Sequence, residues 1–167
     1  MSIPPFTIVE AELSRADHGE AILRLLDAYA MDPMGDGKPL AAFTRRELLP
    51  ALRHHPTTMA FLAYRDTEPV GLAICFFGFS TFAARPLVNL HDFYVTPACR
   101  GAGVGRLLLA AIEKRAREIG CCKLTLEVQE NNHRARNVYA AAGFARMRYV
   151  PEAGGSLFFS KILDDHS

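Results

Sequence analysis

The stretch Arg100-Gly101-Ala102-Gly103-Val104-Gly105-Arg106 is a glycine-rich turn between two segments of regular pattern. A β-like run, residues 88–95, precedes it, and apolar residues at helical spacing follow it. Alternating glycines let a backbone approach a ligand closely, and the amides at the start of a helix point toward an anion. We therefore predict a coenzyme-binding enzyme whose pyrophosphate group lies on this turn.

Two common phosphate-binding loops do not fit the turn. A Walker loop ends in Gly-Lys followed by Ser or Thr, whereas this turn ends in Gly105-Arg106-Leu107. A dinucleotide fingerprint beginning at Gly101 would place its third glycine at position 106, which is Arg, and would omit the spacer of residues 96–99. Glu127 lies where the acidic residue of that fingerprint would be expected, but the missing glycine and the spacer still exclude the fingerprint. The pattern that remains is Arg, two residues, Gly, one residue, Gly, at the start of a helix.

This pattern resembles the acyl-CoA loop of the GNAT superfamily of N-acetyltransferases. Residues 132–144, Asn-His-Arg-Ala-Arg-Asn-Val-Tyr-Ala-Ala-Ala-Gly-Phe, are similar to the second motif of that family in the spacing of Asn, Ala, Tyr and Gly-Phe. Residues 80–86 and 90–95 resemble the diamine (spermidine/spermine-type) acetyltransferase branch, and this closer similarity extends over residues 71–144. The resemblance implies acetyl-CoA as co-substrate and an amine as acceptor.

The resemblance also implies which residues hold the coenzyme. In the family, the strand before the loop binds the pantetheine arm through its backbone, and a bulge there often leaves an amide free for the acetyl oxygen. The turn amides would hold the pyrophosphate, and Arg100 with Arg106 would add charge-assisted bonds, the alternative for Arg100 being a solvated loop cation. Asn132 matches an asparagine that contacts the coenzyme arm, and it also suits the N-cap of its helix. The predicted coenzyme-binding residues are Phe93, Tyr94, Val95, Arg100, Gly101, Ala102, Gly103, Val104, Gly105, Arg106, Asn132 and Ala135.

Three residues are candidates for proton transfer. Tyr139 matches the tyrosine of the family that acts as general acid, and a phenol can donate a proton to a departing thiolate. The alternative for Tyr139 is a helix tyrosine packed on the core. The branch has Glu-Asp where this chain has His91-Asp92, so His91 is a possible base, with a water chain as the alternative. In a regular strand Asp92 would lie on the opposite face from His91, unless a bulge changes the alternation.

Composition limits the class of protein. A chain of 167 residues that is 50% hydrophobic predicts one domain, residues 1–167. The formal net charge of +1, with both signs interspersed, predicts a small-molecule partner and no nucleic acid. The four cysteines lack the spacing of a metal site, and no apolar run is long enough to span a membrane. We predict a cytoplasmic protein that binds no metal and no membrane.

The periodicity of the chain predicts an α/β fold in the order βααβββαβαββ. The expected strands are residues 6–13, 58–64, 70–79, 88–95, 123–129, 144–150 and 157–163. Two of the expected helices open with capping boxes, Asp17 with Glu20 and Thr44 with Glu47, and the other two follow the glycine turn and begin at Asn132. The expected architecture is a GNAT-like mixed, mostly antiparallel sheet of six to seven strands with about four helices, split where the coenzyme enters.

The predicted function is transfer of an acetyl group from acetyl-CoA to a primary amine by direct attack in a ternary complex. A polyamine, diamine or amino-acid-like acceptor follows from the resemblance alone, because acidic and basic residues are balanced in the acceptor region, residues 31–52. A homodimer is likewise implied by the branch. The alternatives are a non-catalytic acetyl-CoA sensor, acetylation of a protein amine, an acyl-enzyme formed through Cys99, and an oxidoreductase.

Overall fold

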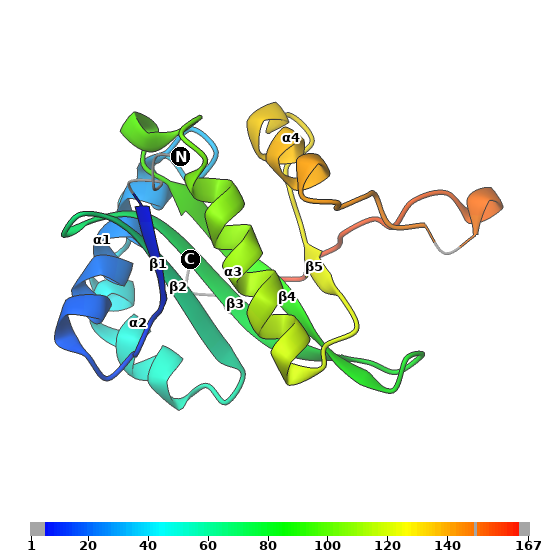
Figure 1. Ribbon diagram of the computed structural model, residues 1–167, viewed down its shortest axis with the longest axis horizontal. Helices are drawn as coiled ribbons and strands as arrows, with labels where there is room; N and C mark the ends of the chain where they lie inside the picture. The colour runs from blue at the N-terminus through cyan, green and yellow to red at the C-terminus, as the bar shows by residue number, and fades with distance from the viewer. Residues whose placement is uncertain (1–5, 149, 164–167) are drawn as a thin grey trace, which may run out of the picture.

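A five-stranded sheet with the order β1-β2-β3-β4-β5 lies at the centre of the computed structural model, which describes residues 6–148 and 150–163 (Figure 1). Neighbouring strands from β1 to β4 are antiparallel, and β4 and β5 are parallel. The strands are β1 (Phe6–Glu10), β2 (Thr58–Arg65), β3 (Glu68–Ser80), β4 (Arg85–Val95) and β5 (Leu124–Leu126). The expectation of a mixed, mostly antiparallel sheet is confirmed.

Helices cover both faces of this sheet, as Figure 1 shows. Side chains alternate along β3, so that Leu72 and Ile74 pack under α1 while Ala73 and Cys75 pack under α3. The α-helices are α1 (Ala16–Met31), α2 (Ala42–His54), α3 (Val104–Ile119) and α4 (His133–Ala141), and two short 3₁₀ turns are η1 (Pro97–Cys99) and η2 (Pro151–Ala153). The four α-helices agree with the predicted number.

The sheet splits along its β4–β5 edge. The two strands pair only from Val88 with Leu124 to Leu90 with Leu126, and β4 then continues to Val95 with no described strand on that side. The backbone of residues 91–95 therefore has no described strand partner on this side of the sheet, although the carbonyl of Val95 accepts from Nε of Arg100.

The last two predicted strands, residues 144–150 and 157–163, are wrong: the described sheet has five strands, not six to seven. Tyr149 lies outside the described residues, and the described part of both segments forms no strand. Their apolar side chains find no sheet face to cover, since Val150 is 51% exposed, Leu157 73% and Phe159 83%. A strand needs a partner backbone as well as apolar residues, and the described residues of these two segments have the apolar residues but pair with no strand.

Both predicted capping boxes are also wrong. The N-cap of α1 is Arg15 and that of α2 is Ala41, and neither cap residue accepts a hydrogen bond through its side chain. Asp17 instead bonds Arg15, whose Nε lies 3.0 Å from its Oδ1. The carboxylate of Asp17 binds the guanidinium of Arg15 in place of a helix amide, and a four-residue capping pattern does not include this alternative partner.

Candidate active site

The glycine turn has the backbone that its composition predicts. Gly101 and Gly103 have φ of 81° and 90°, in the left-handed region that favours glycine. Gly103 is the N-cap of α3 and, having no side chain, leaves the amides of the first turn uncapped. The carbonyl of Gly103 accepts a hydrogen bond from the amide of Leu107 at 3.1 Å. The amides of residues 104–106 therefore remain for an anion, beside the exposed side chain of Arg106.

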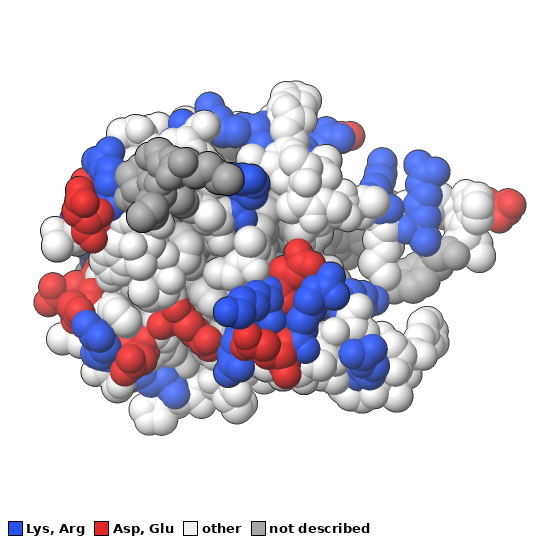
Figure 2. Space-filling view, viewed as in Figure 1, with Lys and Arg blue, Asp and Glu red and all other residues white. Residues whose placement is uncertain are grey.

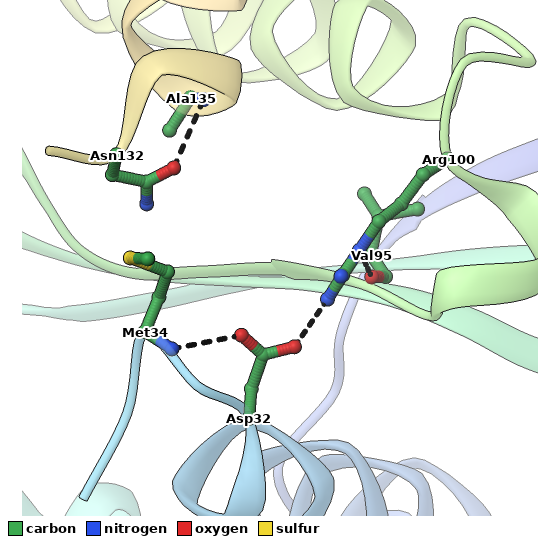
Figure 3. Close-up of polar contacts among 6 residues, drawn as sticks. All are labelled: Asp32, Met34, Val95, Arg100, Asn132 and Ala135. Atoms are coloured by element: carbon green, nitrogen blue, oxygen red, sulfur yellow. Dashed lines mark hydrogen bonds and ion pairs between the residues drawn. The ribbon is translucent and has the colours of Figure 1, made fainter.

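Arg100 is engaged differently from Arg106. Its Nη2 lies 2.5 Å from Oδ2 of Asp32, and its Nε donates to the carbonyl of Val95 at 2.9 Å (Figure 3). Its guanidinium also lies 5.6 Å from the centre of the Tyr94 ring. Arg100 is thus only 23% exposed and turned toward the acceptor side of the site.

A bulge in β4 places both candidate bases on one face of the sheet. Ile74 pairs with Asp92 and Cys75 pairs with Leu90, so His91 is the extra residue. The His91 ring meets that of Phe76 edge-on at 5.3 Å, and Phe76 packs in the layer under α1. Asp92, opposite Ile74, lies on the same side.

Asp92 is the more enclosed of the two candidate bases. Burial raises the pKa of its carboxyl above the ordinary value, and the nearby His91 opposes this increase. A carboxylate whose charged form is destabilised binds protons more readily than a solvated one. Its position therefore suits a group that accepts a proton from an amine.

Tyr139 lies between two aromatic rings, with centroids 5.7 Å from Phe93 and 5.9 Å from Phe144. Its side chain is 8% exposed, and burial followed by the proximity of Tyr29 raises the pKa of its hydroxyl. The phenol is therefore protonated at neutral pH. Burial and then the charge of Asp92 raise the pKa of Tyr29.

The remaining predicted coenzyme residues surround the split in the sheet. Phe93 and Val95 pack against the core under α3, while Tyr94 belongs to the core under α1. Asn132 is the N-cap of α4, and its Oδ1 accepts from the amide of Ala135 at 3.2 Å (Figure 3). The capping role of Asn132 is thus confirmed, and its contact with a coenzyme stays a prediction.

Sequence reasoning missed Tyr29 and the role of Asp32. Tyr29 lies in α1, and its ring is 5.7 Å from that of Tyr94. Asp32 was counted among the charges of the acceptor region without a partner. A long-range ion pair has no local sequence signal, because its two residues are 68 positions apart.

A split mixed sheet, with the uncapped end of a helix behind a glycine turn, is an α/β arrangement whose free amides suit an anionic group. The chain belongs to the acetyltransferase (GNAT) family, whose model matches residues 22–144.

Similar proteins agree with this family. Thialysine N-epsilon-acetyltransferase from Bos taurus is 36% identical over 74 residues, which are 44% of this chain and 43% of that protein. Aminoglycoside N(6')-acetyltransferase type 1 from Stenotrophomonas maltophilia is 37% identical over 67 residues, 40% of this chain and 44% of that protein. The chain thus spans less than half of the length of these two relatives. The crystal structure of a probable acetyltransferase superposes with a TM-score of 0.79 at 22% identity, covering 95% of this chain and 99% of the other, which shows the shared fold.

The described part of the chain contains neither a membrane-spanning helix nor a metal-binding cluster. None of the helices has the length and apolar character needed to cross a membrane. No group of three His, Cys, Asp or Glu side chains within residues 6–148 and 150–163 is arranged to hold a metal ion.

Proposed function

We propose that this protein transfers the acetyl group of acetyl-CoA to a primary amine of a small molecule, by direct attack of the amine in a ternary complex. The observation that carries the proposal is the position of the glycine turn. It leaves a set of uncapped amides at the end of β4, where the strand has lost its partner and where Asp92 and Tyr139 lie close by.

The residues of the split fit a long coenzyme with a diphosphate. The amides of residues 104–106 and the exposed Arg106 would bind the phosphates. Residues 93–95 have no described strand partner on this side, and their backbone groups other than the Val95 carbonyl would pair with the pantetheine arm as an added strand does, with Asn132 and Ala135 on the other side of the split. When bound there, the coenzyme supplies an activated acyl thioester.

The proton transfers are assigned to the two faces of the site. Asp92, alone or with His91 through water, accepts the proton that the amine loses, because both side chains lie on the α1 face after the bulge. Tyr139 stays protonated and donates to the departing thiolate. Its burial among Phe93 and Phe144 keeps water away from that step.

The acceptor is proposed to be a cationic small amine of the polyamine, diamine or amino-acid-like type. Burial and then the charges of Asp92, Asp32 and Asp36 raise the pKa of Tyr29 in the last turn of α1, and of these carboxyl groups Asp32 is paired with Arg100. A second ammonium group of a diamine would be stabilised there. The names of the relatives, which refer to thialysine and aminoglycosides, are consistent with a small amine.

The alternative reactions receive less support. Cys99 is 2% exposed within the core under α3, so an acyl-enzyme at its sulfur would require the core to open. Lys and Arg alternate with Asp and Glu on the face seen in Figure 2, which offers no continuous basic surface to a nucleic acid.

A cytoplasmic location and a homodimer complete the proposal. All four cysteines are unbridged, as is usual for a reducing compartment. The exposed apolar side chains Leu157, Phe158, Phe159, Ile162 and Leu163 favour a second copy as their cover. Light scattering after gel filtration tests the dimer, and a monomer at micromolar concentration would contradict it.

The test is turnover by the purified protein with acetyl-CoA and a panel of amines: spermidine, putrescine, lysine, thialysine and an aminoglycoside. Acetylated product is measured by mass spectrometry, since Cys121 and Cys122 are partly exposed and would disturb a thiol-reagent assay. We expect turnover with at least one amine and a large loss in Tyr139→Phe. Binding of acetyl-CoA without turnover of any amine would instead indicate a sensor, and binding of a nicotinamide dinucleotide in place of CoA would indicate an oxidoreductase.

A further inference from the structure

The ion pair between Asp32 and Arg100 is more enclosed than any other in the described part of the chain. Their side chains are 10% and 23% exposed, whereas each of the other described ion pairs has a partner that is 41% exposed or more. Surface ion pairs contribute little, but a pair shielded from water holds its two groups in place more firmly.

Each partner of this pair is also fixed by its own backbone contacts (Figure 3). Oδ1 of Asp32 accepts from the amide of Met34 at 3.0 Å, while Oδ2 receives Arg100. On the other side, Nε of Arg100 bonds the carbonyl of Val95, the last residue of β4. The pair thus runs from the α1–α2 loop, residues 32–41, to the end of the strand that precedes the glycine turn.

The α1–α2 loop is compact where it meets the pair. The amide of Gly35 bonds the carbonyl of Asp32 at 2.8 Å, and a Cβ at Gly35 would lie 2.2 Å from the carbonyl oxygen of Tyr29. Nε2 of Gln129, in the segment before α4, reaches the carbonyl of Met34 at 3.4 Å. This part of the loop is therefore packed closely around Asp32.

We propose that Asp32 and Arg100 are positioning residues that couple the coenzyme turn to the acceptor-side loop, so that binding of the coenzyme orders the loop against which the amine must bind. This inference rests on the proposed function. Arg100 then acts through Asp32 and Val95, and the phosphate-binding charge of the turn is that of Arg106.

The assignment separates two arginines that the sequence treats alike. Arg106 is exposed in the first turn of α3, beside the uncapped amides. Arg100 has two of its donors committed away from the turn. A phosphate ligand and a positioning residue differ in what their removal changes: the first alters the affinity for CoA, and the second alters the response of the loop.

The experiment is hydrogen–deuterium exchange with and without CoA, alongside the dissociation constant of CoA from calorimetry. In the native protein, saturating CoA should slow exchange in residues 31–37 by about 5-fold or more, the lower end of typical coupling between two sites. In Asp32→Asn the protection of residues 31–37 should disappear while that of residues 100–106 persists. Arg100→Gln should behave in the same way, and the double variant should be no worse than either single variant, because the two residues act as one unit.

Matched controls separate coupling from loss of structure. Asp27→Asn removes the charge that pairs with Arg45, at the far end of the same loop where Asp27 accepts from the Leu40 amide at 2.8 Å, and should leave the CoA-induced protection of residues 31–37 in place. Arg106→Gln should weaken CoA binding by about 10-fold or more, as loss of a charge-assisted bond does. If Arg100→Gln proves unstable, Arg100→Lys retains the charge but loses the bond to Val95, and should show reduced protection at nearly native affinity.

Two results would overturn the inference. One is unchanged protection of residues 31–37 in Asp32→Asn, and the other is a loss of CoA affinity in Arg100→Gln as large as that in Arg106→Gln. Failure of the native protein to bind CoA at all is a different outcome, since it would overturn the proposed function together with the coupling.

Discussion

Replacement of Gly103 by alanine tests the backbone on which the coenzyme site depends. Gly103 has a φ of 90°, and a Cβ placed there would meet no atom within 4 Å. Gly103→Ala should therefore destabilise the fold through its backbone conformation and not through a clash of the new methyl group. The cost is about 1–2 kcal/mol for an L-residue in the left-handed region.

Gly105→Ala is the matched control, two residues further along. Gly105 lies in the first turn of α3 with no positive φ, and its Cβ would make ordinary contacts at 3.5 Å with Val138 and 3.6 Å with Phe93. Alanine at a helical glycine stabilises by up to about 1 kcal/mol. The two variants should thus differ by about 2 kcal/mol in the free energy of unfolding, in opposite directions from the native protein.

Urea denaturation with an unchanged slope measures this difference directly. By thermal unfolding, Gly103→Ala should lower Tm by about 2–8 °C, given a shift of about 2–4 °C per kcal/mol for a domain of this size. The increase in Tm produced by CoA should also shrink, because the altered turn aims its amides differently. The reasoning is refuted if Gly103→Ala is as stable as Gly105→Ala.

Other predictions concern the chemistry and the response to pH. Tyr139→Phe should lower kcat by about 10²–10⁴-fold with little change in the KM for the amine, and an unchanged kcat would remove Tyr139 as the acid. Because burial raises the pKa of Asp92, kcat/KM should increase with pH through an apparent pKa above 3.8. Asp92→Asn should abolish this increase. If the increase persists in Asp92→Asn, the base is another group, such as His91. Burial raises the pKa of Asp32, but the bonds from Arg100 and the Met34 amide outweigh this effect and lower it below 3.8. The stabilisation from Asp32 is therefore present above pH 3.8, and it is lost as the pH falls through the lower pKa of Asp32 in the folded state. Asp32→Asn should thus be less stable than the native protein near neutrality and equally stable in strong acid. Urea denaturation at several pH values measures this difference.

The parts of the fold that the sequence predicted are those with a repeated pattern. The helix after the glycine turn has its apolar stripe over four turns, and it ends at Gly120, whose φ is 85°. The antiparallel pair β2 and β3 was recognisable from two apolar runs around a polar connection. Such patterns state which face is buried, and burial supplies most of the stability of an element.

The failures came where a pattern of a few residues competed with tertiary contacts. Asp17 matched a capping box but bonds Arg15. Residues 157–163 are apolar enough for a strand, yet Leu157, Phe158 and Phe159 are consecutive and exposed, without the alternation that one buried face requires. In the site, the glycine turn was predictable because its conformation depends on consecutive residues. The pairing of Asp32 with Arg100 was not predictable, because the two residues are 68 positions apart.

The bulge at His91 connects the two halves of the site in a way that no single residue reveals. Leu90 packs under α3, so a regular strand would also place Asp92 under α3, where an unpaired carboxylate is costly. The extra residue shifts Asp92 and Tyr94 to the α1 face, toward Tyr29 and the acceptor-side loop. The same residue follows directly on Leu90, the last position at which β4 pairs with β5. One inserted residue thus coincides with the opening of the sheet and brings a carboxylate to the α1 face, so the proposed coenzyme site and the proposed acceptor site meet at this point of β4.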